Sequence, residues 1–252
     1  MRNYRHIEVK PVAGALGAEI VGVDMSNELD DEIVAEVRHA FLEHLVIFLR
    51  DQKVTPAQQV AFAKRFGQPI EYPQLKGLPE APMITPVVKL EHERNNFGGI
   101  WHSDTTYLEL PPMGSMLLAR EIPPYGGDTM FANQYLAYEA LSDGLKKALD
   151  GLIGVSSSSK ADVTKTREDR MKAAGAELKV LAAEHPLVRT HPETGRKCLF
   201  VNHSYTCRFE DMTEQESKPL LEFLLNHGHR PEFTCRFRWQ TGSIAFWDNR
   251  CT

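Results

Sequence analysis

The chain has 252 residues, of which 42% are hydrophobic and 25% charged, as expected of a globular protein with one large domain or two small ones. Its formal net charge of −5 gives no electrostatic reason to expect nucleic acid or an anionic membrane as a partner. No apolar run is long enough to span a bilayer, and the charged stretch Met1 to Lys10 lacks the apolar core of a secretory signal, so we expect a cytoplasmic protein.

The cysteines do not follow a disulfide or metal-binding pattern. The chain has four of them and no Cys-x-x-Cys pair, which is too few for a disulfide framework at this length. We therefore expect Cys198, Cys207, Cys235 and Cys251 to be reduced thiols, as is usual in the cytosol.

The first third of the chain predicts alternating strands and helices. Residues Gly17 to Val23 favour a short strand, and the apolar run Leu45 to Leu49 favours a buried one. Between them, Asp30 is placed to cap a helix that continues to about His44 and has one apolar face. The segment Thr55 to Gly67 opens with Thr-Pro-x-Gln, a capping box with proline at the first position, and closes at glycine, which predicts a second helix.

The rest of the chain predicts mainly strands separated by proline and glycine turns. Five segments have this character: Met116 to Arg120, Thr129 to Ala132, Cys198 to Asn202, Phe233 to Trp239 and Ser243 to Trp247. A capping box at Thr213 and Glu216 predicts a helix that ends at Gly228, and the polar stretch Val155 to Glu184 is expected to be partly helical. We predict an α+β, mainly β, fold for residues 1–252. It would be a single domain with a sandwich or jelly-roll core and helices packed mainly from the N-terminal third.

The segment Trp101 to Tyr107 contains the most informative pair of polar residues. In a strand, residues two apart point to one face, so His102 and Asp104 would direct an imidazole and a carboxylate into one cavity. Such a pair is two-thirds of the 2-His-1-carboxylate triad of non-haem iron(II) oxygenases. Taken alone the pair is weak evidence, because a core histidine hydrogen-bonded to an aspartate, or a zinc-binding β-sandwich, would have the same pattern.

Further segments occur with this pair in a fixed order. They are GAEIVGVDMS, LVIFLRDQKVTPAQQVAFAKRFG, EIPPYGGDTMF, RTHPETGRKCLFVN and GSIAFWDNRCT. Together with WHSDTTY, this ordered set resembles the TauD/TfdA family of taurine and 2,4-dichlorophenoxyacetate dioxygenases over nearly the whole chain. The resemblance implies a double-stranded β-helix core of jelly-roll type and an enzyme that uses iron(II), 2-oxoglutarate and dioxygen.

The resemblance also implies roles for individual residues. His102 and Asp104 match the family's iron ligands, and Thr129 matches the threonine that hydrogen-bonds a carboxylate of 2-oxoglutarate. A hydroxyl suits that task because it donates one hydrogen bond without adding charge. Tyr72, Thr105 and Tyr205 match positions that face the substrate.

Two departures from the taurine branch concern the substrate. Leu75 and Gly98 stand where that branch has polar contacts to taurine, so the resemblance puts taurine itself in doubt. We expect hydroxylation of a small anionic organic substrate of sulfonate or aryloxyalkanoate type, with succinate and carbon dioxide as co-products. The expected partners are small molecules and a second copy of the chain in a homo-oligomer.

A third departure concerns the end of the sequence. In the family, a histidine four residues beyond the arginine of W-D-N-R is the third iron ligand, and an arginine further on pairs with 2-oxoglutarate. Arg250 is that first arginine, so both positions would follow Thr252. We therefore expect a fragment without turnover, lacking C-terminal core strands and exposing Phe237, Trp239 and Phe246. The alternative is a non-catalytic relative that binds a small acid or metal.

Overall fold

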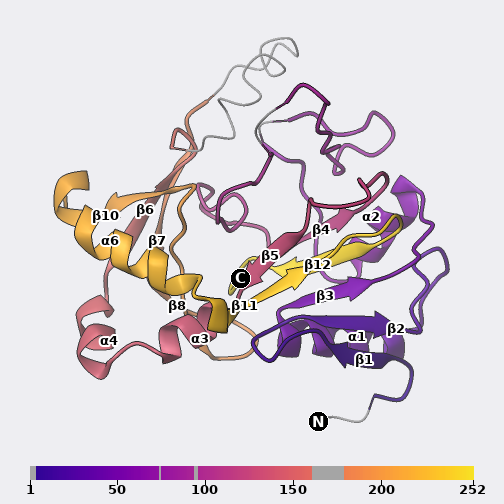
Figure 1. The fold of residues 1–252 in the computed structure, drawn as a ribbon, viewed down its shortest axis with the longest axis horizontal. Helices are drawn as coiled ribbons and strands as arrows, with labels where there is room; N and C mark the ends of the chain where they lie inside the picture. Colours follow the sequence, from indigo (N-terminus) through magenta and orange to yellow (C-terminus); the bar gives the residue numbers. More distant parts are fainter. Residues whose placement is uncertain (1–3, 74, 94–95, 161–178) are drawn as a thin grey trace.

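The structure is a computed structural model that describes residues 4–73, 75–93, 96–160 and 179–252 (Figure 1). The helices are α1 (Asp31–His44), α2 (Pro56–Lys64), α3 (Gln134–Glu139), α4 (Asp143–Leu149), α6 (Glu214–Gly228) and the 3-10 turn η1 (Pro231–Phe233). The strands of the first half are β1 (Glu8–Pro11), β2 (Ala18–Val21), β3 (Val46–Leu49), β4 (Gly114–Leu118), β5 (Thr129–Ala132) and β6 (Ile153–Ser157). Those of the second half are β7 (Ala182–Pro186), β8 (Val188–Thr190), β9 (Lys197–Leu199), β10 (Thr206–Phe209), β11 (Thr234–Phe237) and β12 (Ile244–Asp248).

The largest sheet has five strands in the order β1-β2-β3-β12-β4. Its last strand in sequence, β12, lies inside the sheet and pairs antiparallel with β3 and with β4. Ile244 lies opposite Leu49 on one side and opposite Leu118 on the other. The strand predicted at Ser243 to Trp247 therefore has a neighbouring strand on each edge. Neither of its edges is left unpaired by missing core strands.

Aromatic residues from distant segments cover both faces of this sheet. On one face, Phe41 of α1 stacks on Phe246 with ring centroids 4.3 Å apart. On the other face, Phe48 of β3 stacks on Phe237 of β11 at 3.9 Å and 3°. Trp239 is buried as well, so the predicted exposure of Phe237, Trp239 and Phe246 is wrong. Helix α1 covers one face of the sheet and the β11-β5 pair covers the other, so these aromatic side chains are shielded from solvent.

The predicted helix starts are confirmed with one exception. Thr55 and Gln58 form a capping box at the start of α2, and Thr213 and Glu216 form one at the start of α6. Each cap of this kind stabilises its helix by about 1 kcal/mol. Asp30 occupies the N-cap position of α1, but its side chain makes no cap hydrogen bond, so that part of the prediction is wrong.

The second half of the fold packs α3, α4 and α6 beside the three-stranded sheet β10-β6-β7 (Figure 1). The polar stretch Val155 to Glu184 begins in β6 and ends in β7. Its predicted helical part falls on residues 161–178, outside the described residues. The strand predicted at Cys198 to Asn202 is shorter, because only Lys197–Leu199 pairs with β8.

The alternation predicted over Phe233 to Trp239 is confirmed. Its four apolar members, Phe233, Cys235, Phe237 and Trp239, are buried, although only the central part of the segment pairs as β11. All four cysteines lie in the described chain and are free thiols. Among the helices that the structure describes, none combines the length and the apolar composition needed to cross a bilayer.

Candidate active site

A cavity of about 820 Å³ is lined by both halves of the fold. Its walls come from residues 67–73 and Leu75, the segment 96–105, strands β4, β5 and β12, and the end of α6. Asp104 and Asp128 contribute carboxylates, and none of the described lining residues is a lysine or arginine. The cavity is large enough for a small organic ligand together with a co-substrate.

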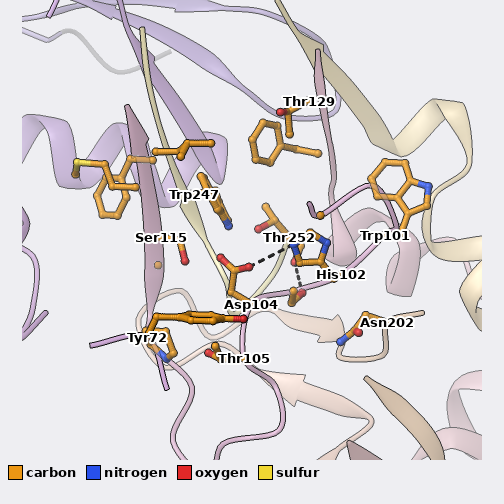
Figure 2. A pocket seen from close by; sticks show the side chains of 18 of the residues that line it. Tyr72, Trp101, His102, Asp104, Thr105, Ser115, Thr129, Asn202, Trp247 and Thr252 are labelled. Carbon is orange, nitrogen blue, oxygen red and sulfur yellow. Dashed lines mark hydrogen bonds and ion pairs between the residues drawn. The ribbon is translucent and has the colours of Figure 1, made fainter. Parts of the chain in front are cut away.

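His102 and Asp104 face each other inside this cavity (Figure 2). The Nε2 atom of His102 lies 3.3 Å from Oδ1 of Asp104, and the two side chains are 28% and 26% exposed. They do not lie on a strand, because residues 101–103 have no regular structure and residues 104–107 form a turn. The strand prediction for this segment is wrong, although both side chains reach one cavity.

Backbone geometry explains why no strand forms here. Thr105 has a φ of 50°, in the left-handed region that a threonine adopts only at a cost of about 1 kcal/mol or more. The residue reverses the chain directly after Asp104. Such strain in a buried residue is typical of functional sites, where surrounding contacts hold it in place.

A backbone carbonyl fixes the orientation of His102. Nδ1 of the imidazole lies 2.7 Å from the carbonyl oxygen of Ile100, which can only accept. Nδ1 therefore carries a proton, and Nε2 points toward the Asp104 carboxylate, where a bound metal would replace the proton that the two groups share. Metal-binding histidines are usually held this way, with the second ring nitrogen donating to a carbonyl or carboxylate.

Asp104 is held by a chain of polar residues from β4 and the end of β12. Ser115 hydrogen-bonds the Asp104 carboxylate, and Ser115 Oγ in turn accepts from Nδ2 of Asn249 at 2.9 Å. Burial raises the pKa of Asp104, but the bonds and charge of His102 and the bond from Ser115 outweigh it, so the pKa lies below its ordinary value. The carboxylate is ionised and ready to bind a cation.

The pair fits a first-row divalent metal. Two ligand atoms at right angles around one metal, each about 2.1 Å away, lie about 3 Å apart. The Nε2 to Oδ1 separation of 3.3 Å is close to this value. Among the described residues, no third histidine, cysteine or acidic side chain joins the pair. Thr252 lies beside it, where its carbonyl oxygen accepts from Ser103 Oγ (Figure 2).

Thr129 borders the same cavity from β5. Its Oγ1 accepts a hydrogen bond from the indole nitrogen of Trp239 at 2.9 Å. An indole N–H only donates, so the single hydroxyl proton of Thr129 remains available for another acceptor. Trp239 was not predicted as a site residue, because its apolar neighbours made it look like a core position.

Hydroxyl groups gather on the Asp104 side of the cavity. Thr105 is 3% exposed, and its Oγ1 has no hydrogen-bond partner among the described residues. The phenol group of Tyr72 lies near those of Tyr107 and Tyr205. Burial, Tyr72 and Asp104 raise the pKa of Tyr107 and Tyr205 well above the usual range, so both remain protonated. Tyr72, Thr105 and Tyr205 line the cavity together, and Tyr107 supports them from behind.

Gly98 lies against the metal-facing edge of His102. A Cβ atom added to Gly98 would lie 3.1 Å from Cε1 and 3.6 Å from Nε2 of the imidazole, and the residue has a φ of 69°. Leu75 lines the cavity as an apolar residue. Both positions are therefore at the cavity, as expected, and neither offers a polar side chain.

A second polar cluster outside this cavity is structural. His191, Asp248 and Cys251 are buried close enough together to share a metal. However, Arg250 donates to both carboxylate oxygens of Asp248 at 2.8 and 2.7 Å, and His191 lies 3.0 Å from Oδ2. A cation already neutralises the carboxylate, so we interpret the cluster as a buried ion-pair network.

The comparison with known proteins decides the family. The profile described as "Taurine catabolism dioxygenase TauD, TfdA family" matches residues 8–252. The chain belongs to this family.

Three relatives place the chain more closely within the TauD/TfdA family. It is 34% identical to the alkylsulfatase of Acinetobacter baylyi over 98% of this chain and 79% of that protein. It is 35% identical to the alpha-ketoglutarate-dependent sulfate ester dioxygenase of Pseudomonas putida, over 98% of this chain and 82% of the relative. A crystal structure of a taurine dioxygenase from Burkholderia xenovorans superposes with a TM-score of 0.82 at 40% identity, covering 98% of this chain and 81% of that one.

Proposed function

We propose that the protein is an iron(II)- and 2-oxoglutarate-dependent dioxygenase that hydroxylates a small anionic organic substrate, forming succinate and carbon dioxide. The observation that carries the proposal is the His102–Asp104 pair. The Nε2 atom of His102 and the Asp104 carboxylate face each other 3.3 Å apart in a cavity large enough for two small ligands. We also propose a jelly-roll core and a single domain over residues 1–252. The same proposal includes a cytoplasmic location and a homo-oligomer.

Iron(II) would be held by His102 and Asp104. When bound, it supplies the redox chemistry that couples dioxygen to 2-oxoglutarate and substrate. Ile100 and Ser115 orient the two side chains toward the metal. Thr252 lies beside the pair, and its carbonyl oxygen accepts from Ser103.

Thr129 would donate its free hydroxyl proton to a carboxylate of 2-oxoglutarate. The bond from Trp239 uses one acceptor lone pair of this hydroxyl and leaves its proton free to donate to the ligand. The phenol and hydroxyl groups of Tyr72, Thr105 and Tyr205 would donate to the anionic group of the substrate. Neutral donors suit this position, because they stabilise an anion without competing with the metal for the Asp104 carboxylate.

A sulfate ester or sulfonate is the substrate class that we favour, and an aryloxyalkanoate is the second candidate. Hydroxylation of the carbon that bears the sulfate ester oxygen, the sulfonate sulfur or the ether oxygen gives an unstable product. This product breaks down to a carbonyl compound and to sulfate, sulfite or a phenol. Taurine is a poor fit, because its ammonium group would meet Leu75 and Gly98 instead of polar side chains. A site without the hydrogen-bond partners that a ligand needs discriminates against it by about a hundredfold or more.

The test compares the turnover of several candidate substrates by the protein. Succinate formation is measured with iron(II), ascorbate and 2-oxoglutarate in the presence of a linear alkyl sulfate, an alkanesulfonate, an aryloxyacetate or taurine. We expect the full-length protein to form succinate with an alkyl sulfate or alkanesulfonate and to release the matching sulfur oxyanion. Sulfite release from taurine as efficient as from every other sulfonate would refute the substrate assignment. Absence of 2-oxoglutarate-dependent succinate with all substrates would refute the proposed reaction.

Replacing Thr105 by valine tests the hydroxyl group without changing the shape of the side chain. Because Oγ1 has no partner among the described residues, its loss should leave the free energy of unfolding unchanged or slightly increased. If the hydroxyl binds substrate, kcat/KM for the substrate falls by about tenfold, as expected for one hydrogen bond of about 1 to 1.5 kcal/mol. Steady-state kinetics and urea unfolding on the same variant separate the two effects. A lower stability with unchanged kcat/KM would show that the hydroxyl is structural.

Replacing Trp239 by phenylalanine tests the orientation of Thr129. The variant keeps an aromatic ring at a buried position and removes only the bond to Oγ1. Thr129 can then rotate its proton away from the ligand, so KM for 2-oxoglutarate should rise by about 3- to 10-fold, the value of one hydrogen bond. The dissociation constant of the metal should stay constant. The proposal for Thr129 fails if the dissociation constant of the metal changes and KM for 2-oxoglutarate does not.

A further inference from the structure

The loop that contains His102 and Asp104 is held by a contact of the neighbouring residue Trp101, which has no role in the proposed reaction. The indole ring of Trp101 stacks on the imidazole of His229, with centroids 5.2 Å apart and planes 4° from parallel. Trp101 lies on the side of His102 that faces away from Asp104 (Figure 2). His229 follows α6 directly, as its C-terminal cap residue. The stack thus connects a segment without regular structure to the end of a helix.

His229 is itself held by a second histidine. Its Nε2 lies 2.8 Å from Nε2 of His203, so one ring donates and the other accepts. Burial lowers the pKa of both rings, and His229 and Lys160 lower that of His203 further. One neutral ring can therefore accept from the other, whereas two cations would repel. His203 lies in the loop between β9 and β10, so the pair joins two elements on one side of Trp101.

The connection from Trp101 to His102 runs through one peptide unit. The carbonyl oxygen that holds Nδ1 of His102 belongs to Ile100, and this carbonyl shares a planar peptide group with the backbone nitrogen of Trp101. Any rotation of Trp101 that tilts this plane moves the oxygen away from Nδ1. The orientation of the imidazole therefore depends on where the indole ring is held.

The opposite flank of the loop has its own anchors. Nε2 of His185 lies within 3.0 Å of the carbonyl oxygens of Thr106 and Leu108. Asn202 donates to Thr106 Oγ1 at 3.1 Å. These contacts fix the chain after Asp104. Before His102, the ring of Trp101 stacks on His229, and Asn96 earlier in the segment accepts from Lys89.

We propose that Trp101, held by His229 and its partner His203, is a positioning residue for His102, because it fixes the peptide plane whose carbonyl oxygen orients the imidazole. The proposal rests on the proposed function, in which His102 binds the metal. Outer-sphere partners of metal ligands typically change metal affinity by about 10- to 100-fold. Acting through one further contact, the His229 stack should contribute about tenfold, the lower end of that range.

Three variants separate the stack from the hydrogen bond. His229→Ala removes both, His229→Phe keeps an aromatic ring for Trp101, and His203→Ala removes only the bond. His39→Ala, at a half-exposed position of α1, is the matched control. Cobalt(II) is titrated into each full-length protein, and both the dissociation constant and the visible ligand-field spectrum at saturation are recorded. We expect binding about tenfold weaker and an altered spectrum for His229→Ala. Values close to wild type are expected for both His229→Phe and His203→Ala, because each lacks the hydrogen bond but keeps an aromatic ring against Trp101.

Hydrogen exchange of the amides of residues 100–104 is measured on the same proteins without metal. We expect faster exchange in His229→Ala and unchanged exchange in His229→Phe and in the control. Equal cobalt affinity and equal exchange in wild type and His229→Ala would overturn the proposal, as would a His229→Phe variant as impaired as His229→Ala. If wild-type protein binds no cobalt at all, the proposed function fails instead, and the exchange rates alone decide whether the stack orders the loop.

Discussion

Replacing Asp104 by asparagine is expected to weaken binding of a divalent metal by more than about 100-fold. The change keeps the shape of the side chain and removes the charge that the metal binds. Loss of a direct ligand should exceed the 10- to 100-fold effect of outer-sphere changes. Manganese(II) or cobalt(II) titration of the full-length protein measures the dissociation constant, and succinate formation should fall to background in parallel.

Two controls make this result specific to Asp104. Asp128→Asn removes another carboxylate that lines the same cavity and should leave the constant within about twofold, because Asp128 pairs with Arg236 and not with His102. Ser115→Ala removes the hydrogen bond to Asp104 and should give an intermediate loss of 10- to 100-fold. Unchanged metal affinity in Asp104→Asn, together with reduced stability, would mean that His102 and Asp104 form an ordinary structural pair.

The second large effect concerns the buried network at the end of β12. Asp248 is 1% exposed and accepts from Arg250 and His191. Asp248→Ala leaves Arg250 with Glu193 as its one remaining ion-pair partner and leaves His191 buried without an acceptor. Removing one member of a buried ion pair costs about 3 to 5 kcal/mol, so we expect the free energy of unfolding in urea to fall by that amount. Glu232→Ala, which breaks the exposed pair with Arg230, should cost 1 kcal/mol or less by the usual range of about 0 to 1 kcal/mol.

The pH dependence of this effect has a definite sign. Burial raises the pKa of Asp248, but the bonds from Arg250 and His191 and their charges outweigh it, so the folded-state pKa lies below its ordinary value. A depressed carboxyl pKa stabilises the folded state above the unfolded-state value of about 3.9. This stability is lost as the pH falls below about 4 toward the folded-state pKa. The difference between wild type and Asp248→Ala should therefore be constant from pH 5 to 7 and shrink in acid. A difference that grows in acid would contradict the assignment.

Local signals in the sequence were enough for helices α1, α2 and α6 and for strands such as β3 and β11, whereas the short helices α3 and α4 were not predicted. Two capping boxes, the apolar run before Arg50 and the alternation from Phe233 to Trp239 all depend on residues within one turn or one strand of each other. The fold follows these signals closely, because burial and capping favour the same element at each place. The main failure was the strand predicted at His102 and Asp104, where the left-handed Thr105 and contacts from elsewhere hold the segment as a loop.

The contacts that complete the site lie far apart in the sequence. Asn249 donates a hydrogen bond to Ser115, the partner of Asp104, and these two residues are 134 positions apart in the sequence. Trp239 and its partner Thr129 are 110 positions apart. No periodicity or spacing predicts such pairs, because they depend on β12 lying next to β4 and on β11 pairing with β5. Family resemblance supplied the residues that we propose for ligand binding, and only the structure supplied the side chains that hold these residues in place.

A crystal structure of the full-length protein grown with manganese(II) and 2-oxoglutarate tests the central claim most directly. We predict the metal bound to Nε2 of His102 and to a carboxylate oxygen of Asp104. A carboxylate of 2-oxoglutarate should lie within hydrogen-bond distance of Thr129 Oγ1, and Trp239 should still donate to that hydroxyl. A metal bound elsewhere, for example among His191, Asp248 and Cys251, with His102 and Asp104 bonded only to each other, would contradict the account.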